Sequence, residues 1–197
     1  MKNIIFISVM MLLVSGQFFA QESKQKSKYR HKGLKISAGL GELENNFEKF
    51  SEKLTGEGGM LSLGWGISNR STLWLTVLAA SRKDAETRSE KDGFAALELN
   101  WQYRFRPESA FQPYVKLGGG LYFIDRKSAV FSGGGLAGAI GADLFLSSHI
   151  AVGAELQIKG QNYSRRSETI NGVELTTKVD PGLQGESTGF MFTLTLQ

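Results

Sequence analysis

The sequence predicts an all-β protein, folded as an eight-stranded antiparallel up-and-down β-barrel that crosses a membrane. Three observations support this fold class. Hydrophobic residues recur at every second position, the opposite face of each segment is rich in glycine and alanine, and long and short connections alternate. The length of 197 residues suits one domain, or two small ones.

Residues 1–20 are expected to be a secretory signal peptide and are excluded from fold reasoning. Lys2 supplies the positive n-region, and residues 4–14 form an apolar stretch of h-region length. We expect cleavage after Ala20, with a cut after Gly16 as the alternative. An N-terminal membrane anchor is disfavoured because the apolar run is short for a spanning helix.

Residues 21–33 are expected to be a polar, basic periplasmic tail that is solvated and disordered, with contact to anionic lipid headgroups as an alternative. The formal net charge of +4 falls to +3 once Lys2 is removed, which is too little to imply nucleic acid as a partner. The chain has no Cys, so disulfides, thiolate metal sites and cysteine nucleophiles are excluded.

The predicted barrel domain covers residues 34–197 and contains eight segments with a hydrophobic period of two. They are 34–41, 58–67, 72–82, 94–105, 113–124, 134–146, 150–163 and 189–196.

Each segment, taken in order, carries large apolar side chains at alternate positions. In the first four the leading pairs are Leu34 and Ile36, Leu61 and Leu63, Leu73 and Leu75, and Leu97 and Leu99. In the last four they are Leu117 and Leu121, Leu136 and Ile140, Val152 and Leu156, and Phe190 and Phe192. The opposite face is expected to be small, polar or charged in every segment.

Compared with a water-soluble sheet, the orientation is expected to be reversed, with the apolar face toward lipid and the other face toward the barrel interior. Glycine weakens a solvent-facing strand, whereas small residues suit a narrow barrel interior. Aromatic residues also gather in two interfacial belts, as in membrane barrels. One belt holds Trp65, Trp101, Tyr103 and Phe105, and the other holds Phe123 and Phe190.

The connections between the predicted strands run 16, 4, 11, 7, 9, 3 and 25 residues. Tight periplasmic turns alternating with long outer loops are typical of outer-membrane barrels. Eight strands place both termini on the periplasmic side and leave an interior that side chains fill, so a porin-sized aqueous channel is not expected. The sheet must close, because open edges are too costly in hydrocarbon.

Two stretches resemble the small eight-stranded outer-membrane β-barrel family, also described as the porin family or outer membrane protein β-barrel domain. Residues 111–122, FQPYVKLGGGLY, look like that family's fifth strand, and residues 138–155 look like its sixth-to-seventh hairpin. The resemblance covers roughly residues 34–196 and implies outer-membrane lipids, the barrel-assembly machinery and periplasmic chaperones as partners. The family's last strand commonly ends in an aromatic residue, whereas this chain ends in Gln197.

Seven charged residues are expected to point into the lumen, and they nearly cancel. Our first interpretation is a structural ladder of ion pairs, because buried charges persist when paired and hydrogen-bonded. The alternative is a polar path or gate for small solutes or ions. The seven are Lys35, Glu98, Arg104, Lys116, Asp143, Glu155 and Lys159.

No catalytic residue, metal site or cofactor is predicted, so the chain is not expected to be an enzyme. Ser147, Ser148 and His149 are consecutive in the tightest turn, where adjacent residues are expected to point apart and no acid is placed nearby. His31 lies in the tail, and two distant histidines without Cys make no recognisable metal site.

The long loops 42–57 and 164–188 are the candidate sites for a surface partner. In the first, Leu43, Phe47, Phe50 and Leu54 recur at helical spacing and predict a short amphipathic helix, with a disordered loop as the alternative. In the second, Asn171-Gly172 predicts a short hairpin, so the flanking strands are expected to project beyond the membrane and to offer an edge for β-augmentation, or only a rigid loop.

The sequence therefore predicts an integral outer-membrane protein with a structural or surface-interaction role. One alternative is a narrow conduit for small solutes or hydrophobic compounds. A third is a secreted soluble ligand-binding barrel of lipocalin type, which would keep its apolar face inside and its charged face outside.

Overall fold

The computed structural model describes residues 29, 31–47, 50–83, 91–126, 129–170 and 173–197. The expected signal peptide, most of the tail and Asn171-Gly172 lie outside these residues. The described residues form eight strands: β1 (Gly33–Phe47), β2 (Phe50–Gly66), β3 (Ser71–Lys83), β4 (Lys91–Arg104), β5 (Phe111–Arg126), β6 (Ala129–Phe145), β7 (Ile150–Ile170) and β8 (Val173–Leu196).

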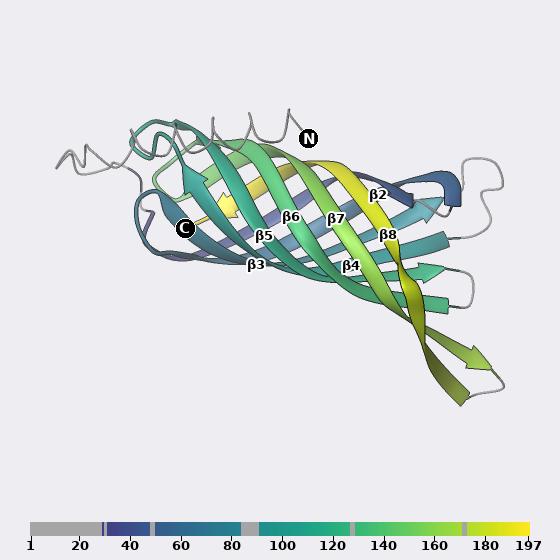
Figure 1. The fold of residues 1–197 in the computed structure, drawn as a ribbon. Coiled ribbons are helices and arrows are strands. Elements are labelled where there is room, and N and C mark those ends of the chain that lie inside the picture. The colour runs from purple at the N-terminus through teal and green to yellow at the C-terminus, as the bar shows by residue number, and fades with distance from the viewer. Residues whose placement is uncertain (1–28, 30, 48–49, 84–90, 127–128, 171–172) are drawn as a thin grey trace, which may run out of the picture.

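The strands form one closed barrel in which each pairs antiparallel with its neighbours in sequence (Figure 1). Closure is made between β1 and β8, in a ladder that runs from Ile36↔Leu196 to Phe47↔Gly185. The predicted fold class is confirmed. We call the end that carries Gly33 and Gln197 the terminal end, and the end where β7 turns into β8 the hairpin end.

The outer wall carries the apolar face of every strand. Leu40, Leu136 and Ile158 are each at least two-thirds exposed, and the alternating residues face the interior. A water-soluble barrel of lipocalin type would bury these side chains, so this arrangement contradicts that alternative. The described part of the chain contains no helix that is long and apolar enough to cross a membrane.

The predicted helix in 42–57 is wrong, because β1 and β2 continue through this segment as a hairpin. The register places Phe47 opposite Phe50, and Asn45 opposite Leu54. Spacings of four fit one face of a strand as well as one face of a helix. The one spacing of three, from Phe47 to Phe50, falls where the chain reverses between β1 and β2. The apparent helical pattern therefore comes from two consecutive strands and the turn that joins them.

The expected alternation of long and short loops is also wrong. At the hairpin end, the connections between strands cover only 48–49, 84–90, 127–128 and 171–172. Most residues assigned to long loops instead extend the strands. Both faces of a strand meet water beyond the membrane, so the apolar alternation that marks the strands is lost there.

The hairpin predicted around Asn171-Gly172 is confirmed, since Ile170 pairs with Val173. β7 and β8 are the longest strands, and their hairpin projects past the neighbouring strands (Figure 1). A large irregularity separates this projection from the barrel wall: Tyr163 pairs with Leu183, but Arg165 pairs with Lys178.

Candidate functional site in the barrel interior

All seven predicted lumen charges lie inside the barrel, and six of them form three ion pairs. Arg104 and Asp143 are 3.6 Å apart near the terminal end. Lys116 Nζ lies 2.5 Å from Glu155 Oε2, and the Lys159 ammonium contacts the Glu98 carboxylate farther along the lumen. The pairs join β4 to β6, β5 to β7 and β4 to β7, so they fill part of the interior and link strands that are not neighbours in the sheet.

Lys35 is the seventh charge, and it forms no ion pair with an acid of the described residues. Its ammonium instead donates a 2.7 Å hydrogen bond to the side-chain oxygen of Gln197. The backbone N–H of Gln197 also donates to the carbonyl of His149. Gln197 therefore contacts a buried lysine at the terminal end of the lumen.

The two middle ion pairs are completed by neutral hydrogen-bond donors. Glu155 accepts bonds from the Tyr114 hydroxyl at 2.8 Å and from Gln157 at 2.5 Å, in addition to Lys116. Glu98 accepts a 3.2 Å bond from Asn100 as well as the bond from Lys159. Buried charges are tolerated under these conditions, when each is paired and hydrogen-bonded.

A small cavity lies between these two pairs and has a volume of about 20 Å³. Its lining includes Glu98, Lys116, Glu155 and Lys159, with Met60 also contributing to the wall. A cavity of this size holds roughly one water molecule. The polar centre of the described interior therefore has room for about one water molecule between the two ion pairs.

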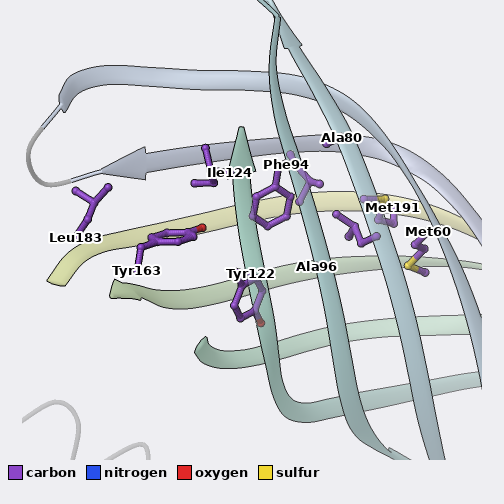
Figure 2. Close-up of a cluster of buried hydrophobic side chains, with 11 residues drawn as sticks. Met60, Ala80, Phe94, Ala96, Tyr122, Ile124, Tyr163, Leu183 and Met191 are labelled. Atoms are coloured by element: carbon purple, nitrogen blue, oxygen red, sulfur yellow. The ribbon is translucent and has the colours of Figure 1, made fainter. Parts of the chain in front are cut away.

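Toward the hairpin end, the interior holds a large apolar cluster beside the buried polar residues Asn45, Gln161 and Ser187, and the sequence interpretation missed this cluster. A cluster of buried side chains points inward from the strands (Figure 2). Its members are Leu43, Met60, Leu78, Ala80, Phe94, Ala96, Tyr122, Ile124, Tyr163, Leu183 and Met191. The expectation that the inner face is small, polar or charged in every segment is wrong for this half of the lumen.

Inward glycines make room for the large inward side chains. A Cβ added to Gly64 would lie 2.6 Å from the Trp74 ring, and one added to Gly141 would lie 2.6 Å from the Tyr114 hydroxyl. Trp74 in turn donates a 2.5 Å bond to Gln102. The signal for these missed residues is a large side chain directly opposite a glycine on the next strand, as in Tyr114↔Gly141.

The tail does not behave as a solvated segment where it is described. Tyr29 and His31 are buried, and their rings pack on Phe145 with centroid distances of 4.9 and 5.6 Å. His31 Nε2 lies 2.7 Å from the carbonyl oxygen of Pro107. Gly33 has a φ of 102°, a conformation that favours glycine, where the tail turns into β1. At residues 29 and 31, the tail is therefore buried against the barrel rather than solvated as expected.

Burial lowers the pKa of His31 from 6.5 to about 4. The hydrogen bond to Pro107 acts in the opposite direction, while the positive charges of Arg104 and Lys35 lower the pKa further. His31 is therefore neutral at pH 7. It packs with Tyr29 and Phe145 in a buried aromatic cluster at the terminal end.

The predicted interfacial aromatics lie on the outer wall. Trp65, Trp101, Phe123 and Phe190 are exposed, whereas Tyr103 and Phe105 are half-buried. Near the terminal end, Tyr103 lies 5.9 Å from Trp101 and 5.5 Å from Phe105, ring centre to ring centre.

Ser148 and His149 do not point apart as expected, because Ser148 Oγ lies 2.8 Å from His149 Nδ1. His149 is exposed, and Ser147 Oγ accepts bonds from the backbone N–H groups of His149 and Ile150, as in an ordinary turn. Within the described ranges, no group of three or more His, Asp or Glu residues is arranged to hold a metal ion.

Comparison with known proteins places the chain in a family. Residues 6–179 match the outer membrane protein beta-barrel domain, and the chain belongs to this family of outer-membrane barrels. A search of curated proteins found no match.

Solved structures of low identity share the fold. Neisserial surface protein A has 13% identity and a TM-score of 0.63, with 84% of this chain and 97% of that one covered. OprG of Pseudomonas aeruginosa has 15% identity and a TM-score of 0.51, covering 85% and 99%. A major outer membrane protein of Thermus thermophilus has 12% identity and a TM-score of 0.53, covering 83% and 99%. The fold and family define an integral outer-membrane β-barrel protein.

Proposed function

We propose that this outer-membrane barrel acts as a structural and surface-interaction protein rather than as a channel or an enzyme. The observation that carries the proposal is the closed interior. Two central ion pairs and the apolar cluster fill the lumen one after the other, and the cavity beside the ion pairs has room for about one water. The outward apolar face is then the surface that contacts outer-membrane lipids.

The proposal includes an orientation with both termini in the periplasm after removal of residues 1–20. β1 begins and β8 ends at the terminal end, as the bond from Lys35 to Gln197 requires. The strands extend farthest at the hairpin end, where β7 and β8 project, and such long extensions suit the extracellular side. The projecting β7–β8 hairpin would then extend from the cell surface, where it is free to meet a partner.

Planar-bilayer recordings test the closed interior. We expect no sustained conductance from wild type, from Glu98→Ala or from Glu155→Ala, with folding of each verified by heat-dependent electrophoretic mobility. Sustained conductance of folded wild type would overturn the proposal and favour the alternative of a narrow conduit for small solutes or hydrophobic compounds.

Cysteine labelling tests the orientation, because the chain has no native Cys. Thr177 is exposed on the projecting hairpin, and Glu108 is exposed in a turn at the terminal end. In intact cells, a membrane-impermeant maleimide should label Thr177→Cys but should label Glu108→Cys only after the outer membrane is permeabilised. The reverse pattern would contradict the orientation.

A further inference from the structure

The segment that precedes β1 joins strands at the terminal end that are not neighbours in the sheet. The carbonyl oxygen of His31 lies against Gly66 at the end of β2, where an added Cβ would collide with it. The His31 side chain contacts Pro107 in the turn after β4, at 2.7 Å, and Phe145 at the end of β6. β2 pairs only with β1 and β3 in the closed sheet. We call Tyr29 and His31, with the chain that joins them to β1, the strap.

The strap lies over charged side chains near the ends of the strands. Arg104 is the last residue of β4, and Lys35 and Asp143 lie third from the ends of β1 and β6. All three point inward and are at most 4% exposed. Charged side chains are rarely buried so completely, and this close to a strand end they would meet water if nothing covered them. The strap therefore keeps water from this part of the interior.

The layer under the strap is packed but incompletely hydrogen-bonded. His31 Nδ1, Arg104 Nε and Gln112 Oε1 are buried without a hydrogen-bond partner among the described residues. Gln197 Nε2 lacks one as well. Burial of a polar group without a partner is costly, and water would satisfy it. Entry of water at the terminal end would therefore offset part of the cost of removing the strap.

The strap can leave without disturbing the barrel wall. The ladder between β1 and β2 begins at Gly33, opposite Gly66, so the strap precedes the paired backbone. Gly33 has a φ of 102°, which favours glycine, and the chain turns sharply there. Rotation about Gly33 would lift Tyr29 and His31 away while the ladder from Leu34 onward stays paired.

We propose that the strap is a releasable cover of the terminal end, which swings away at Gly33 and admits water to Lys35, Arg104 and Asp143. The two central ion pairs and the apolar cluster lie farther along the lumen and stay in place when the strap is released. The inference goes beyond the proposed function, because it adds a second conformation at one end of a barrel that remains non-conducting.

Protonation of His31 supplies a trigger for release. Burial lowers its pKa to about 4, so between pH 6.5 and 4 a proton binds mainly to the released strap. The docked ring already lies near the positive charges of Arg104 on β4 and Lys35 on β1, and Asp143 on β6 is the described acid that faces both. A protonated ring would be the third cation beside this single acid. The other groups around the ring are uncharged, namely Tyr29, Pro107, Gln112 and Phe145.

Single cysteines report the release, because the chain has no native Cys. Ala151 is 1% exposed and packs with Tyr29 and Phe145, so the strap covers a cysteine at this position. Thr195, directly opposite Ala151 and also buried, provides a second reporter. Ala96 is 3% exposed in the apolar cluster toward the hairpin end and provides the matched control.

The probe is dithiodipyridine, a small neutral thiol reagent that also reacts in acid. Each variant is studied as folded protein in lipid vesicles, with folding verified by heat-dependent mobility. Each labelling rate is divided by the rate of the denatured protein at the same pH, which removes the pH dependence of the reagent itself.

Lowering the pH from 7 to 5 should raise the labelling rate of Ala151→Cys by about twentyfold, the change in released population that pKa values of about 4 and 6.5 produce. Thr195→Cys should respond alike, and Ala96→Cys should not respond. Adding His31→Gln keeps a donor for the Pro107 carbonyl but takes up no proton, so the rate should be equal at both pH values. Adding His31→Ala removes the hydrogen bond and the ring contacts and should raise the rate at pH 7 by about tenfold or more.

Equal rates at pH 7 and pH 5 for both reporters, or a pH response that persists with His31→Gln, would overturn the release of the strap. Labelling of Ala96→Cys in step with the reporters would overturn it as well, because the whole barrel would then be opening. Each of these results, with non-conducting bilayers, would leave the proposed function standing. Conductance of the folded wild type at pH 7 would instead refute the proposed function, while the labelling rates would still measure the strap.

Discussion

Removing one partner of the ion pair between Glu98 and Lys159 should destabilise the barrel strongly. The two side chains are 4% and 1% exposed, so each charge depends on the other for solvation. Loss of one partner of a buried pair costs about 3–5 kcal/mol. The neighbouring cavity of about 20 Å³ admits roughly one water, which moderates the cost. We therefore expect Glu98→Gln and Lys159→Met each to lower the free energy of unfolding by about 3 kcal/mol.

The double variant Glu98→Gln/Lys159→Met separates the charge effect from packing. It leaves no uncompensated buried charge, and we expect it to lie within about 1 kcal/mol of wild type. Urea unfolding in lipid vesicles, followed by tryptophan fluorescence and heat-dependent mobility, measures all four proteins. If the double variant lost the sum of the two single effects, the residues would be independent and the ion-pair argument would be refuted.

Two further predictions concern the packing of inward glycines and the burial of His31 at the terminal end. Gly64→Ala should lower the free energy of unfolding by about 1–3 kcal/mol, because the added Cβ would lie 2.6 Å from the Trp74 ring. The control Gly160→Ala, where an added Cβ has no atom within 4 Å, should change it by no more than about 0.5 kcal/mol. Equal effects of the two variants in urea unfolding would contradict this prediction. Burial holds the pKa of His31 at about 4 rather than 6.5, so between these pH values His31 binds a proton only when it leaves its buried site. Packing of His31 against the barrel should therefore be complete above pH 6.5 and should weaken as the pH falls toward 4. NMR titration of the His31 ring measures this, and an inflection near pH 6.5 would refute the buried site.

The fold was predictable because lipid imposes one rule on every strand. Leu97 and Leu99 must face hydrocarbon, which fixes Glu98 on the inside without knowledge of any neighbour. The same rule defines strand position only within the membrane. Beyond it, as in residues 175–178 of β8, both faces are exposed and the sequence loses the distinction between a strand and a loop.

The inner face was only partly predictable, because its contents depend on register. Trp74 and Leu78 lie at inward positions of β3, where large apolar residues depart from the pattern of small and polar ones. Such large side chains fit only where the neighbouring strand has a small residue directly opposite, as Gly64 on β2 lies opposite Trp74. The sequence of one strand does not reveal which residue of the next strand lies opposite.

The position of the apolar cluster changes how the charged residues should be interpreted. A gate made of charges would open when one of its ion pairs is removed, provided that nothing else closes the lumen. Here Leu78, Phe94 and Met191 belong to a buried apolar cluster on the hairpin side of the central carboxylates Glu155 and Glu98. Loss of a central carboxylate therefore leaves the apolar barrier in place, and its main effect falls on stability. This sequential closure favours a structural role for the ion pairs over a gating role, and it directs the search for activity to the projecting strands.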